Sequence, residues 1–169
     1  MAFTLRDAAP ADVPDVLRLV RGLAEYEHLL HEVAMTEADL HGALFGPQPR
    51  AYALLAHVEK QAVGLVEEQA VGLALWYYTF STFRGRSDIF LEDLFVEPPH
   101  RGHGIGLALL RQLARRAVAE QCRRIEWRVL NWNAPSIAFY ESLGATRMED
   151  WHVRRLGGEA LAALAKGSE

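Results

Sequence analysis

The six residues Arg101 to Gly106, with the sequence RGHGIG, carry the strongest chemical signal in the chain. They separate an apolar segment that favours a strand from an amphipathic segment that favours a helix. Their three glycines let the backbone come close to a ligand, and the free N–H groups at a helix start attract anions. A pyrophosphate would fit this turn, although a tight strand-to-helix corner has the same composition.

The spacing of this turn excludes two common nucleotide-binding motifs. The pattern R-x-x-G-x-G differs from the dinucleotide fingerprint, and no βαβ unit precedes it. The turn also lacks the Gly-Lys-Ser/Thr ending of a Walker loop.

Glu92 and Asp93 are adjacent acids in the apolar segment DIFLEDLFV, residues 88–96. Neighbouring side chains of a strand point to opposite faces, so at least one of these two faces the interior or a cleft. Burying a carboxylate without a partner is costly. A functional site explains such a residue, and for Asp93 a bond to backbone or arginine at a sheet end is the alternative.

The chain resembles the GNAT acetyltransferase superfamily in its R-x-x-G-x-G turn and in NWNAPSIAFYESLGA, residues 131–145. Within that superfamily, LAEYE at 23–27 and FLEDLFV at 90–96 are similar to the spermidine/spermine and thialysine N-acetyltransferase group. The likeness covers nearly the whole chain and is looser over residues 47–90.

This resemblance implies acetyl-CoA as co-substrate. The strand backbone at Leu94 and Val96 would bond the pantetheine arm as a sheet edge does, and the RGHGIG turn would hold the pyrophosphate. The residues implied in cofactor binding are Leu94, Phe95, Val96, Arg101, Gly102, His103, Gly104, Ile105, Gly106, Asn133 and Ser136.

Attack of an amine on a thioester needs a neutral amine, a polarised carbonyl and a proton for the leaving thiolate. The resemblance makes Glu92 the base, acting through water, and Tyr140 the acid. A packed helix aromatic is the alternative for Tyr140. Because Cys122 lies outside every motif, we expect direct transfer in a ternary complex rather than an acyl-enzyme.

Tyr26 and Glu27 match the end of the family's first helix, where acids and an aromatic line the amine pocket, and Asp93 would help to hold the amine. The stretch His28 to His31 is less acidic than in polyamine enzymes. A short amine, such as thialysine, lysine or a small diamine, is therefore expected. The alternatives are acetylation of protein lysines and a non-catalytic acetyl-CoA-binding sensor.

Periodicity and capping residues predict the elements that position these groups. The predicted order β-α-α-β-β-β-α-β-α-β implies an α/β fold with a mixed central sheet flanked by helices, and the resemblance implies that this sheet is GNAT-like and mostly antiparallel. Thr36 and Asp39 form a capping box. Asn133 caps a helix that ends before Gly144, which suits the left-handed position after a helix. The predicted strands cover residues 3–6, 51–58, 72–79, 88–96, 124–130 and 147–156, and a well-formed helix covers 104–120.

Composition limits the class of protein. The 169 residues fit one domain over 1–169, and the net charge of −4 gives no general attraction for nucleic acid or an anionic membrane. The single cysteine excludes an internal disulfide, no apolar run suits a membrane span, and the histidines form no metal site. We expect a cytoplasmic enzyme, and the resemblance suggests a homodimer.

An internal repeat interrupts the middle of the chain. Residues 61–65 and 69–73 both read QAVGL, which is too short for a solenoid unit and indicates a local duplication. Either copy could pair with the preceding strand.

Overall fold

A computed structural model describes residues 1–62 and 65–167 of the chain. The chain divides into two compact units, residues 1–128 and 129–169. The prediction of a single domain over 1–169 stays a prediction.

The first unit is built on a sheet in which the described strands follow the order β1-β2-β3-β4-β5. The first four are antiparallel neighbours, and β5 pairs in parallel with β4. This confirms the predicted mixed, mostly antiparallel sheet. The strands are β1 (Thr4–Asp7), β2 (Tyr52–Ala62), β3 (Leu65–Ser81), β4 (Arg86–Val96) and β5 (Ile125–Trp127).

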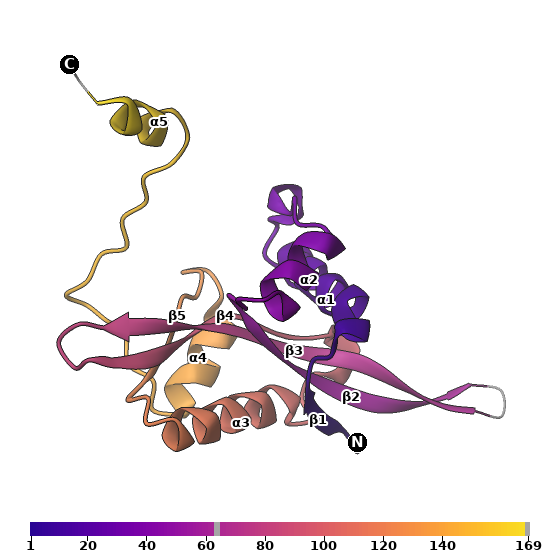
Figure 1. Cartoon of the computed structure of the whole chain (residues 1–169). Coiled ribbons are helices and arrows are strands. Elements are labelled where there is room, and N and C mark those ends of the chain that lie inside the picture. The colour runs from indigo at the N-terminus through magenta and orange to yellow at the C-terminus, as the bar shows by residue number, and fades with distance from the viewer. Residues whose placement is uncertain (63–64, 168–169) are drawn as a thin grey trace. The chain divides into compact units, whose positions relative to one another are not determined.

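Helices cover both faces of this sheet. The helices α1 (Val13–Tyr26) and α2 (Glu37–Phe45) lie on one side, and α3 (Ile105–Ala119) lies on the other (Figure 1). On the α1 side, a core of buried apolar residues from the helices and strands includes Phe95 of β4. On the α3 side, Gly72 permits close packing, because a Cβ there would lie 3.0 Å from Ile105 Cγ2.

Local capping explains where the helices begin. Thr36 Oγ1 accepts the N–H of Asp39 at 3.2 Å while the Asp39 carboxylate accepts the N–H of Thr36 at 3.0 Å, which confirms the predicted capping box. Three short 3₁₀ turns that the sequence did not predict join the elements, at Pro10–Asp12, Leu30–Glu32 and Pro98–His100.

The second unit contains α4 (Ala134–Ser142) and α5 (Gly158–Lys166). The Asn133 side chain accepts the N–H of Ser136 at 3.3 Å, and Gly144 has φ of +85°, so the predicted cap and the predicted left-handed glycine are both confirmed. The sequence did not predict α5.

Two strand predictions need correction. The predicted strand over 147–156 is wrong, because those residues form no regular element in the structure. Apolar residues recur there, but a strand also needs a neighbour to pair its backbone groups. The predicted strand over 124–130 is reduced to β5, whose pairing with β4 ends at Leu91 opposite Trp127.

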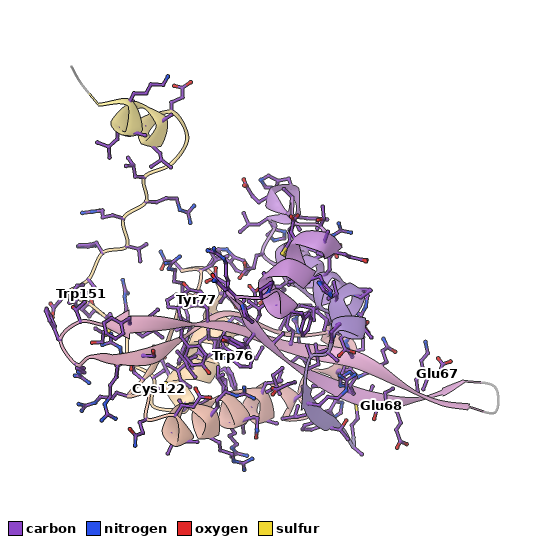
Figure 2. The ribbon with its side chains drawn as sticks, viewed as in Figure 1. Glu67, Glu68, Trp76, Tyr77, Cys122 and Trp151 are labelled. Atoms are coloured by element: carbon purple, nitrogen blue, oxygen red, sulfur yellow. The ribbon has the colours of Figure 1, made fainter. Side chains whose placement is uncertain are left out.

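The QAVGL duplication lies within one long hairpin formed by β2 and β3. The second copy pairs its Leu73 with Leu55, whereas Gln61 and Ala62 of the first copy pair with Val66 and Leu65 at the far end. Val63 and Gly64 of the first copy lie outside the described residues. The two copies therefore lengthen the hairpin, on which Figure 2 shows Glu67 and Glu68 far from Trp76.

Candidate active site

A β-bulge in β4 sets the direction of the two adjacent acids. Trp76 of β3 pairs with Leu91, and the preceding Leu75 pairs with Asp93, so Glu92 is the extra residue. Leu75 belongs to the core on the α1 side, and Asp93 opposite it shares that face. Glu92 is exposed and Asp93 is half-buried, which confirms that one of the two acids faces the interior.

Three carboxyl groups interact at this point. Burial, together with the charges of Glu92 and Glu27, raises the pKa of Asp93 to about 7. Burial also raises the pKa of Glu27, which follows α1 directly. The structure therefore brings together the three acids that the sequence singled out, in a setting where a positive charge is favourable.

Beyond the bulge, one edge of β4 is open. Among the described residues of 1–128, no strand pairs with it. The pairing of β5 stops at Leu91, although β4 runs on to Val96. Phe95 pairs with Leu73, and the N–H of Glu97 donates to Val71 O at 2.9 Å. The backbone N–H and C=O groups of the odd-numbered residues in this part of the chain therefore point toward β3. The backbone groups of Leu94 and Val96 therefore point to the open edge, as strand-like binding of an extended ligand requires.

The turn after β4 has the geometry of an anion site. Gly102 and Gly104 have φ of +77° and +82°, a region that favours glycine, and Gly104 is the N-cap of α3. A Cβ at either glycine would meet no atom of the described residues within 4 Å, so space is open above the turn. The first N–H groups of α3 begin here, at Ile105 and Gly106. A pyrophosphate fits this arrangement.

The side chain of Arg101 bridges this turn and the end of α1. Its Nε donates to Val96 O at 2.8 Å, and its guanidinium carbon lies 4.8 Å from the Tyr26 ring centroid and 5.5 Å from that of Phe95. The pyrophosphate role expected for Arg101 stays a prediction.

Arg18 is a positioning residue that the sequence analysis missed. It forms ion pairs with Asp15 at 2.9 Å and with Glu97, and it donates to Ala70 O at 2.6 Å. Glu97 directly follows β4, so Arg18 ties α1 to the strand end that leads into the RGHGIG turn. An arginine in an amphipathic helix gives no signal of the contacts with Glu97 and Ala70, because these two residues are distant in the sequence.

Tyr140, Asn133 and Ser136 belong to the second unit. Tyr140 lies on α4, with its ring centroid 5.4 Å from that of Phe139, and the other two form the cap at the start of the same helix. The roles of these three residues stay predictions.

Cys122 lies just after α3 (Figure 2). Burial raises the pKa of its thiol, and the charges of Glu120 and Asp88 raise it further, which disfavours the reactive thiolate.

Among the described residues, no group of three or more His, Cys, Asp or Glu side chains is arranged to hold a metal ion. No helix in that part of the chain is long and apolar enough to cross a membrane.

Solved structures share this fold. An integron cassette protein from the mobile metagenome of V. cholerae has a TM-score of 0.78 and 25% sequence identity, and the match covers 99% of both chains.

Sequence comparison gives the family. A sequence model of the acetyltransferase (GNAT) family matches residues 23–145, and the chain belongs to this family. A thialysine N-epsilon-acetyltransferase of Bos taurus is 38% identical over 98% of this chain and 99% of its own length. A spermidine/spermine N(1)-acetyltransferase-like protein 1 of Homo sapiens is 36% identical over 96% of this chain, which is 24% of that longer protein. The chain is thus an acyltransferase, and acetyltransferases of this family use acetyl-CoA as co-substrate.

Proposed function

We propose that this enzyme acetylates the primary amine of a small cationic metabolite, such as thialysine, lysine or a short diamine. The observation that carries the proposal is the position of Asp93. This half-buried acid lies beside Glu27 and Glu92, immediately before the open backbone edge at Leu94 and Val96. An ammonium group held by these acids would lie next to a thioester held along that edge.

The role proposed for each residue in the reaction follows from its surroundings. Glu92 is exposed at the bulge, where it can take a proton from the bound ammonium through water. Asp93 and Glu27 hold the substrate's positive charge. Acetyl-CoA supplies the activated acetyl group, and Leu94 and Val96 orient its arm by backbone hydrogen bonds while Gly102 to Gly106 hold its pyrophosphate.

Tyr140 completes this scheme as the proton donor to the leaving thiolate. Asn133 and Ser136 fix the start of the helix that carries it. The acetyl group passes directly between the two substrates, because the surroundings of Cys122 disfavour its thiolate.

The preference for a short amine rests on the number of acids near the end of α1. Three carboxyl groups are coupled there, Glu27, Glu92 and Asp93, and the residues from His28 to His31 add no further acid. A long polyamine carries several ammonium groups that would need additional partners. Relatives that are 36–38% identical bear the name thialysine N-epsilon-acetyltransferase, which supports the same preference.

We also propose one domain, a homodimer and a cytoplasmic location. The family match over residues 23–145 crosses the division at residue 128 and supports a single domain. The segment 147–156 exposes the apolar side chains of Met148, Trp151 and Val153, which supports burial against a second copy. Sedimentation of the full chain and of a form ending at residue 146 tests this assembly.

Two measurements test the function. Acetyl-CoA should raise the melting temperature, and thiol release should then require thialysine, lysine or putrescine. Glu92→Gln should slow turnover by at least tenfold, whereas Glu67→Gln on the distant hairpin should not. Stabilisation without thiol release would indicate an acetyl-CoA sensor. Faster release with a lysine peptide than with any free amine would indicate a protein acetyltransferase.

A further inference from the structure

The guanidinium of Arg101 contacts both parts of the proposed site, the acetyl-CoA edge and the amine pocket. The Arg101 side chain donates to the carbonyl of Val96, which is a backbone group at the edge proposed for the pantetheine arm. The same guanidinium lies over the ring of Tyr26, the aromatic proposed for the amine pocket. Tyr26 is the last residue of α1, whereas Arg101 begins the turn after β4.

An arginine is well suited to both contacts. Its planar, delocalised guanidinium can lie over an aromatic ring while its Nε–H donates in the plane. A lysine has a compact ammonium group and cannot make both contacts with the same geometry. Phe95 flanks the guanidinium at 5.5 Å, so the side chain is held between a strand residue and a helix residue.

We propose that Arg101 is a positioning residue that couples acetyl-CoA binding to amine binding through Tyr26. The inference rests on the proposed function. Tyr26 holds the guanidinium at the cofactor edge, and in return the guanidinium holds the ring at the wall of the amine pocket. A change at either residue then affects both ligands, because each side chain holds the other in place.

A double-mutant cycle tests this coupling. Arg101→Lys, Tyr26→Leu and the double variant are compared by calorimetric titration with acetyl-CoA in the absence of amine. Tyr26→Leu should weaken acetyl-CoA binding about fivefold, because the freed guanidinium must be ordered when the cofactor binds. In the Arg101→Lys background, Tyr26→Leu should not weaken acetyl-CoA binding further.

Steady-state kinetics give the second readout. Each single variant should raise the Michaelis constant for thialysine about fivefold with less change in kcat, and the double variant should be no worse than either. Tyr26→Phe keeps the aromatic ring and should bind acetyl-CoA more tightly than Tyr26→Leu does. Arg50→Lys, an exposed arginine outside the site, is the matched control.

The outcomes separate this inference from the proposed function. If the two substitutions multiply in their effect on the acetyl-CoA dissociation constant, or if Tyr26→Leu leaves that constant unchanged, the coupling is refuted. The titrations need no amine substrate. A wild-type enzyme that acetylates no amine would therefore overturn the proposed function while the binding cycle still decides whether the two residues are coupled.

Discussion

Asp93 lies opposite Leu75 across the β3–β4 ladder, so its carboxyl group shares the apolar face that α1 covers. This position raises its pKa to about 7, against an ordinary value of about 3.9 in an unfolded chain. Between these two values the folded protein holds a proton that the unfolded chain has released. The contribution of Asp93 to stability is therefore present below pH 4 and is lost as the pH rises to 7.

Asp93→Asn should stabilise the protein at pH 8, because it removes this buried negative charge. The expected gain in the free energy of unfolding is about 1 to 3 kcal/mol, and the gain should shrink as the pH falls towards 4. Urea unfolding at several pH values measures it. Glu67→Asn on the hairpin is the control. An equal gain in the free energy of unfolding in the two variants, or no gain for Asp93→Asn at pH 8, would contradict the raised pKa of Asp93.

Gly104→Leu should weaken acetyl-CoA binding at least tenfold more than Gly104→Ala does. Both variants place a side chain at φ of +82°, at a strain cost of about 1 to 2 kcal/mol. Because a Cβ there meets no described atom within 4 Å, only a ligand above the turn should distinguish leucine from alanine. Titration with acetyl-CoA measures the difference. Equal affinities in two folded variants would place the pyrophosphate elsewhere.

Much of this architecture could be predicted from the sequence because its signals are local. The capping pair Thr36 and Asp39 and the cap Asn133 act within a single helical turn, so residue type and spacing define them. Likewise, Gly144 was recognisable as a position of positive φ just after a helix.

The features missed by the sequence analysis depend on pairing between distant segments. The bulge at Glu92 exists only because β3 pairs with Leu91 and Asp93 on either side of it. The contact of Arg101 with Tyr26 joins two elements that are far apart in the chain. The strand expected over 147–156 failed for the same reason, since recurring apolar residues alone provide no partner for a backbone.

Tyr140→Phe should lower kcat about 100-fold and leave the Michaelis constant for acetyl-CoA nearly unchanged, because only the proposed proton donor is removed. The ring and its contact with Phe139 are retained. Single-turnover rates should be compared, so that slow product release does not mask the chemical step. Wild-type rates in a variant with an unchanged melting temperature would make Tyr140 a packing residue.

Cys122→Ala should retain kcat within about twofold of the wild type, since the raised pKa of the thiol disfavours a nucleophilic role. Rapid-quench analysis should detect no acetyl group on the protein at any time during turnover. An acetylated enzyme that disappears in Cys122→Ala would show a covalent mechanism instead of direct transfer.

The most direct test is a competition between amines. Equal concentrations of thialysine, spermine and a lysine-containing peptide are offered with limiting acetyl-CoA, and mass spectrometry identifies which of them gains an acetyl group. The ratio of products gives the ratio of specificity constants directly. We predict that acetylated thialysine predominates, because the acids Glu27, Glu92 and Asp93 suit a short cation. Predominance of acetylated spermine or peptide, or no acetylated product, would contradict the proposed function.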